Sequence, residues 1–160
     1  MEYRELESSN LTEAAGLIWK VFSEFVGPGY SGEGVETFKK VIRVEELENS
    51  LQSGKIYMEG CFEGEKLVGV VSMRDFSHVS LLFVDKAYHG RGIARGLFAK
   101  ALERCIREKP ELCEITVNSS PYAVEAYKKL GFEAAGEQNT RDGITSTPLK
   151  MKVGPRQPSA

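Results

Sequence analysis

The spacing of hydrophobic positions changes along the chain and divides it into three parts. In residues 11–52, apolar side chains recur every three or four positions, as they do on one face of a helix. In residues 55–84 they form short runs separated by turn residues, which is typical of strands. From residue 94 onward, helical and strand-like patterns alternate. The pattern predicts early helices, then a meander of three strands, and then helix and strand in alternation.

Capping and turn residues set the expected limits of each element. Strands are expected at residues 3–7, 55–62, 66–74, 78–84, 112–118, 132–136 and 147–153. Helices are expected from a cap at Asn10 or Thr12 to Gly27, at residues 35–43 and 45–52, from residue 94 to Pro110, and from a cap at Ser119 or Ser120 to Leu130. Residues 31–34 are expected to be loop and residues 154–160 a disordered tail. This order predicts an α/β protein with a mixed sheet and helices on both faces.

The composition fits one globular domain over residues 1–153. The chain has 160 residues, of which 41% are hydrophobic and 28% are charged. Its net charge of −2 gives no basic footprint for nucleic acid. No apolar run approaches the roughly 20 residues of a membrane span, and the first residues lack the layout of a signal peptide. We expect a cytoplasmic protein with neither nucleic acid nor a membrane as partner.

The three cysteines, Cys61, Cys105 and Cys113, argue against two kinds of site. An odd number without CxxC spacing favours neither a disulfide framework nor a zinc site. Each cysteine is expected to be a reduced thiol, and no bound metal is expected.

The chemistry of the chain concentrates in the stretch YHGRGIARGLF, residues 88–98. Gly90, Gly92 and Ala94 alternate at the start of the expected helix, where unpaired N–H groups and the helix dipole favour phosphate. Glycine allows a close approach of the backbone, and Arg91 and Arg95 add full positive charges. The stretch is therefore a candidate cradle for a pyrophosphate.

Several kinds of loop share some of these features. A P-loop would require Gly-Lys-Ser or Gly-Lys-Thr, which the chain lacks. A dinucleotide fingerprint would follow its strand at once, whereas residues 85–89 intervene here. A plain turn, in which the glycines only redirect the chain, is the remaining alternative to an acyl-CoA site.

The sequence around this stretch, and a second segment after it, resemble one protein family. The segment LLFVDKAYHGRGIARGLFAKALE resembles the acetyl-CoA-binding motif of the GNAT superfamily of acyl-CoA-dependent N-acyltransferases. Its pattern is Gln or Arg, two variable residues, Gly, one variable residue, and Gly or Ala. Gly92 and Ala94 match, and His89 departs from the usual Gln or Arg. The segment EITVNSSPYAVEAYKKLGF is similar to a second family signature. The resemblance extends over residues 3–153.

The resemblance implies a GNAT-like α/β (α+β) fold. Its central sheet would be mixed and mostly antiparallel, with six to seven strands and helices on both faces. Acetyl-CoA would be the co-substrate. Its pantetheine would pair with the backbone of Leu82, Phe83 and Val84, where the strand parts from its parallel neighbour at a bulge. Its pyrophosphate would lie on N–H groups, with charge added by Arg95. The residues of that loop are His89, Gly90, Arg91, Gly92, Ile93 and Ala94.

Three side chains are candidates for catalysis, and each has a structural alternative. Tyr127 stands at the position of the family's usual tyrosine, whose phenol donates a proton to the departing thiolate; otherwise it packs in the core. Asn118 can bond pantetheine or the amine, or can cap a turn. His78 can titrate near neutrality as a general base, or can be a structural histidine at a strand end.

The segment between the first two helices covers the acceptor pocket in this superfamily. Phe25, Tyr30, Glu33 and Phe38 are therefore the expected acceptor-side residues, with a solvated surface acid as the alternative for Glu33. The resemblance implies transfer of an acetyl group to a primary amine, on a small molecule or a peptide, by direct attack in a ternary complex. The alternative is a non-catalytic acyl-CoA-binding or sensor domain. A homodimer is an open option.

Overall fold

The computed structural model describes residues 1–154. The part of the chain expected to be a disordered tail lies, from residue 155 onward, outside the described residues. The first half contains β1 (Glu2–Glu5), η1 (Ser8–Asn10), α1 (Leu11–Val21), the π-helical η2 (Phe22–Val26), η3 (Gly27–Gly29), α2 (Gly32–Val41), α3 (Val44–Gln52), β2 (Ile56–Glu63), β3 (Lys66–Arg74) and β4 (His78–Val84). The second half contains η4 (Lys86–Tyr88), α4 (Ile93–Glu108), β5 (Glu114–Ser119), η5 (Pro121–Ala123), α5 (Val124–Leu130), β6 (Glu133–Ala134), β7 (Asn139–Arg141) and β8 (Ile144–Lys152).

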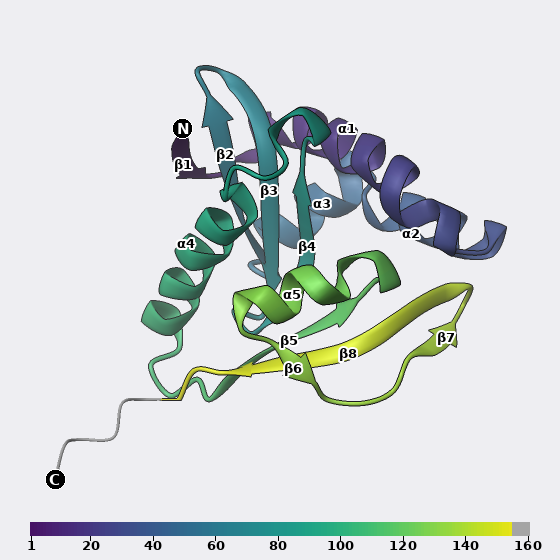
Figure 1. The fold of residues 1–160 in the computed structure, drawn as a ribbon. Coiled ribbons are helices and arrows are strands. Elements are labelled where there is room, and N and C mark those ends of the chain that lie inside the picture. The colour runs from purple at the N-terminus through teal and green to yellow at the C-terminus, as the bar shows by residue number, and fades with distance from the viewer. Residues whose placement is uncertain (155–160) are drawn as a thin grey trace, which may run out of the picture.

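The strands form one mixed sheet in the order β1-β2-β3-β4-β5-β8-β6, with β7 paired to β8 (Figure 1). The β4–β5 pair is parallel, and the other strand pairs of the described chain are antiparallel. This confirms the expected mixed, mostly antiparallel sheet, with eight strands instead of six to seven. The additional strand is β7, whose three residues are all exposed and polar. It therefore carries no alternation of apolar and polar positions that a sequence could reveal.

Helices cover both faces of the sheet, as expected (Figure 1). Alternate side chains of a strand point to opposite faces, so Val70 and Val71 belong to different buried clusters. One cluster joins the sheet to α4 and α5 through Leu97, Phe98 and Tyr127. The other joins it to α1 and α3 and includes Ile18 and Leu47. No described helix is both long and apolar enough to cross a membrane.

The loop before the second helix is shorter than expected. Residues 32–34 are not loop, because α2 begins at Gly32, and the Ser31 hydroxyl caps the helix by accepting the Gly34 N–H at 3.2 Å. A β-carbon at Gly34 would lie 2.2 Å from the Gly143 carbonyl oxygen, so this glycine lets the helix meet the β7–β8 turn. Val41, the last residue of α2, is 54% exposed.

The predicted caps before α5 also differ from the structure. Ser120 precedes η5 without a side-chain capping bond, and the Ser119 hydroxyl donates to the Ser120 carbonyl at 2.8 Å. The short 3₁₀ turn between β5 and α5 separates these serines from the first residue of the α-helix, Val124. Their hydroxyl groups therefore cannot act as its cap.

Candidate active site

The candidate site begins where two parallel strands separate. β4 and β5 pair only at His78–Thr116 and Val79–Val117. On its other side, β4 continues to pair with β3 up to Val84. Ser80 is an extra residue in that ladder, since Val79 faces Met73 and Leu81 faces Ser72. The bulge turns β4 away from β5, so in the described chain this edge of β4 has no strand partner from Ser80 onward.

A cleft of about 530 Å³ occupies the gap between these strands. It is lined by all the residues expected to bind the cofactor except Arg91, and by two of the four expected acceptor residues. The predicted residues that line it are Tyr30, Phe38, Leu82, Phe83, Val84, His89, Gly90, Gly92, Ile93, Ala94, Arg95, Asn118 and Tyr127. The structure thus brings together side chains from both faces of the sheet.

One wall of the cleft is the loop that enters α4. Gly90 and Gly92 have φ angles of 78° and 76°, in the left-handed region that favours glycine. Gly92 is the N-cap of this 16-residue helix and has no side chain to cap it, so the first N–H groups of α4 have no side-chain partner at this position. We call His89, Gly90, Gly92, Ala94 and Arg95 the loop wall. Its open helix end and basic charge suit an anion.

The basic side chains in and beside the loop that enters α4 contact other parts of the protein. The Arg95 guanidinium donates to the Lys129 carbonyl at 3.1 Å, at the end of α5, and Lys129 itself lines the cleft. The Arg91 guanidinium lies 4.9 Å from the centroid of the Tyr88 ring, and Arg91 itself does not line the cleft. The His89 Nε2–H donates to the Val84 carbonyl at 2.8 Å. The side chain of His89 thus ties the loop to the end of β4.

Tyr127 and Asn118 both line the cleft, from α5 and from β5. Tyr127 is 7% exposed, packs edge-on against Phe132 at 5.5 Å, and lines the cleft. Burial raises the pKa of its hydroxyl, so the group keeps its proton at neutral pH. Asn118 is exposed near the end of β5, opposite Pro148 of β8. A buried phenol and an accessible amide therefore face the same space.

The opposite wall is aromatic. Tyr30 follows η3, Phe38 lies in α2, and Phe83 lies in β4, with ring centroids of Phe38 and Phe83 5.9 Å apart. Behind them, the fully buried Phe22 stacks on Phe38 at 3.9 Å and meets Tyr30 edge-on at 5.4 Å. We call Tyr30, Phe38 and Phe83 the aromatic wall. The π-helical turn η2 precedes it, and such turns recur at functional sites.

Phe25 does not line the cleft but packs on residues that do. Its ring stacks on Tyr122 at 5.2 Å and approaches His89 at 5.3 Å. Phe25 lies in η2, Tyr122 in η5 and His89 in the loop wall, so these rings connect three segments around the cleft. The structure therefore places Phe25 against lining residues and not in the cleft, where a contact with the acceptor was expected.

Two expected site residues lie elsewhere. His78 stands at the start of β4, before the bulge, and its Nδ1 is 2.8 Å from the Thr116 hydroxyl. Burial and then the charge of Arg74 lower the pKa of the His78 imidazole. Glu33 is exposed in the first turn of α2, because that helix begins earlier than expected. Neither residue lines the cleft, so its geometry does not support the roles of base and acceptor carboxylate, which stay predictions.

Sequence reasoning missed several lining residues, including Ser80 and Lys129. Ser80 is recognisable only from the register of β3 against β4, because a bulge leaves no signal in the periodicity of one strand. Lys129 is an ordinary cation near the end of α5, where cations are common.

Comparisons with known proteins agree with this geometry. A profile of the acetyltransferase (GNAT) domain matches residues 26–153. A segment of 64 residues is 34% identical to an uncharacterised N-acetyltransferase of Methanocaldococcus jannaschii. The match covers 39% of this chain and 28% of that relative.

Two solved structures share the fold. One is a GCN5-related N-acetyltransferase from Rhodopseudomonas palustris, with a TM-score of 0.79, 21% identity and 95% of both chains covered. The other is the PaiA N-acetyltransferase from Thermoplasma acidophilum, solved in complex with coenzyme A, with a TM-score of 0.78 and 19% identity over 95% of this chain and 98% of that chain. The domain profile spans most of the chain, and the fold agrees with it: the chain belongs to the acetyltransferase (GNAT) domain family.

Proposed function

We propose that the protein transfers an acetyl group from acetyl-CoA to a primary amine while both substrates are bound. The separation of β4 from β5 beside the uncapped start of α4 carries this proposal. It supplies an unpaired strand edge for an extended amide chain and N–H donors for a pyrophosphate in one cleft. The complex of the Thermoplasma relative with coenzyme A supports the same choice of ligand.

In this proposal the loop wall holds the pyrophosphate, and the backbone of Leu82, Phe83 and Val84 pairs with pantetheine. The thioester then lies near the bulge at Ser80, between β4 and Asn118. Asn118 can accept from or donate to either substrate through its amide. Because these contacts use backbone groups, they tolerate His89 in place of the family's usual residue.

The reaction forms one bond and breaks another. The neutral amine nitrogen attacks the thioester carbonyl carbon, and the carbon–sulfur bond breaks as the tetrahedral intermediate collapses. The amide product keeps the acetyl group, and the sulfur takes a proton from Tyr127. Because burial raises the pKa of Tyr127, its phenol still carries at neutral pH the proton that the sulfur takes. The amine loses its own proton to water in the open cleft, and water then returns a proton to Tyr127.

Two measurements test the proposal. Calorimetry should detect acetyl-CoA binding, and a thiol-release assay with a panel of amines should detect turnover. Acetyl-CoA binding without turnover of any amine would favour the sensor alternative, and absence of binding would overturn the assignment. The acetyl group rather than a longer acyl chain, the cytoplasmic location, the single-domain boundary and the homodimer remain predictions.

A further inference from the structure

The cleft passes through the gap in the sheet and therefore has one wall on each face. Leu82 and Val84 pack with the cluster that contains α4 and α5, whereas Leu81 and Phe83 pack with the cluster that contains α1 and α3. The loop wall and Tyr127 lie on the first face. Val21, Phe38 and Phe83 line the cleft from the second, and Tyr30 adjoins them through its contact with Phe22. A ligand held by the loop wall leaves this second side free for the acceptor.

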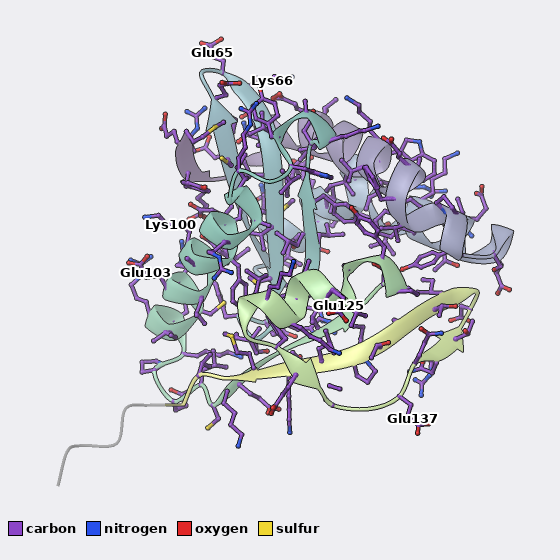
Figure 2. The ribbon with its side chains drawn as sticks, viewed as in Figure 1. Glu65, Lys66, Lys100, Glu103, Glu125 and Glu137 are labelled. Atoms are coloured by element: carbon purple, nitrogen blue, oxygen red, sulfur yellow. The ribbon has the colours of Figure 1, made fainter. Side chains whose placement is uncertain are left out.

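The acceptor side offers rings and branched aliphatic groups but no ionic partner. Among the cleft-lining residues of the described chain there is no aspartate or glutamate. Glu24, next to Phe25, is bonded to Lys86 at 2.7 Å, and the buried Asp85 accepts the Ala87 N–H at 2.9 Å. Figure 2 shows Glu65, Glu103 and Glu137 projecting outward from the ribbon, and all three are exposed. A second ammonium group on the acceptor would find no carboxylate in the cleft.

A carboxylate on the acceptor would also lack a partner on this side. The cations that line the cleft are Arg95 and Lys129, and both belong to the side formed by α4 and α5. In the proposed function that positive charge faces the pyrophosphate. Burying an unpaired charge against rings costs more than the apolar contact returns.

We propose that the acceptor is a small amine with a single amino group on an aromatic or branched apolar body, with neither a carboxylate nor a second cation. This inference rests on the proposed function. The apolar body packs on the aromatic wall, where offset and edge-on ring contacts are favourable. Polyamines, amino sugars and free amino acids are thereby disfavoured.

A matched set of amines tests the inference on the whole protein with acetyl-CoA. 2-Phenylethylamine carries the apolar body alone, phenylalanine adds a carboxylate to it, and spermidine replaces it with further cations. We expect kcat/KM for 2-phenylethylamine to exceed that for each of the others by at least about tenfold. Equal or better turnover of spermidine or phenylalanine would overturn the inference and leave the proposed function intact.

Binding separates failure of the inference from failure of the proposed function. Calorimetry with acetyl-CoA tests the cofactor side alone, and loss of that binding contradicts the proposed function itself. If acetyl-CoA binds but no apolar amine is acetylated, the inference about the acceptor is wrong. A peptide acetylated better than 2-phenylethylamine is likewise a contrary result.

Variants of the aromatic wall test whether these rings cause the preference for an apolar amine. Phe38→Ala should raise KM for 2-phenylethylamine about tenfold without changing the acetyl-CoA Kd. Val41→Ala, on the exposed side of the same helix, is the matched control and should change neither quantity. Because Phe38 stacks on the buried Phe22, Phe38→Ala can also lower the stability of the fold. Tyr30→Glu therefore provides a second variant, at a half-buried position. It should shift the kcat/KM ratio at least about tenfold toward spermidine, and an unchanged ratio would contradict the inference.

Discussion

The loop wall and the aromatic wall face the same cleft but offer different chemistry. The loop wall offers main-chain N–H groups, two left-handed glycines and the charge of Arg95. The aromatic wall offers side-chain surface, with Phe22 stacked behind it. A site made of backbone changes little when its side chains change, provided that its glycines remain. A site made of rings changes with every substitution. In the proposed function, the fold therefore determines what the cofactor half of the site binds, whereas the identity of the side chains determines what the acceptor half binds.

The largest expected effect is on stability, from removing the support of the aromatic wall. Phe22→Ala should lower the free energy of unfolding by about 3–5 kcal/mol, because Phe22 is fully buried and contacts the rings of Trp19, Tyr30 and Phe38. Urea unfolding measures this change. Phe22→Leu, which keeps most of the apolar volume, should cost less than half as much. Similar losses in both variants would show that ring packing is not what supports this wall.

The next effect concerns the loop wall and acetyl-CoA. Gly92→Asp should weaken binding at least a hundredfold, on the order of 3 kcal/mol, because it combines a negative charge near phosphate with strain at a φ of 76°. Gly64→Asp is a matched control: its φ is 61°, and a β-carbon there has nothing within 4 Å, as at Gly92. Calorimetry should find the Gly64→Asp affinity unchanged. Equal affinities for the two variants would refute the cradle.

Tyr127→Phe separates chemistry from binding. It should lower kcat about a hundredfold, the low end of acid–base catalysis, with the acetyl-CoA Kd unchanged. The fold should persist, since the ring and its contact with Phe132 remain. Tyr122→Phe, at an exposed ring that also lines the cleft, serves as the comparison for loss of a hydroxyl. Normal kcat in Tyr127→Phe would leave water as the proton donor.

A smaller effect is expected at Arg95, which is exposed and already bonded to the Lys129 carbonyl. Arg95→Ala should weaken acetyl-CoA binding roughly fivefold at low salt, and the difference should shrink as salt rises. Arg95→Lys keeps the charge and should recover most of the loss. A loss that does not depend on salt would mean that the arginine acts by holding α5.

The smallest effect is expected at His78, which lies outside both walls. Burial holds its pKa below the ordinary value, so the unfolded chain binds its proton at a higher pH than the native protein. His78 should therefore reduce stability as pH falls below about 6.5, and have no such effect above that pH. His78→Asn should lose less stability than the parent between pH 7 and 5 in urea unfolding. The pH profile of kcat should be the same in the parent and in His78→Asn. Loss of one limb of that profile in the variant would support His78 as the general base.

Much of the fold was predictable from the sequence because burial imposes periodicity. β3 and β4 have their expected limits, since their apolar runs end at clear turns. The loop wall was predictable because a turn into a helix at left-handed φ demands glycine, which leaves a readable spacing at Gly90 and Gly92. Tyr127 and Asn118 followed from the family resemblance, and both line the cleft. Their roles stay predictions.

What only the tertiary structure decided is which side chains meet across the sheet. The bulge at Ser80 depends on how β3 and β4 align, and this alignment determines where the cleft opens and leaves His78 outside it. The early start of α2 depends on contact between Gly34 and Gly143, which are far apart in sequence, and it leaves Glu33 exposed. The aromatic wall joins η3, α2 and β4, and no local pattern records that meeting. Local preferences constrain neighbours in sequence, whereas an acceptor site depends on distant contacts formed only when the core packs.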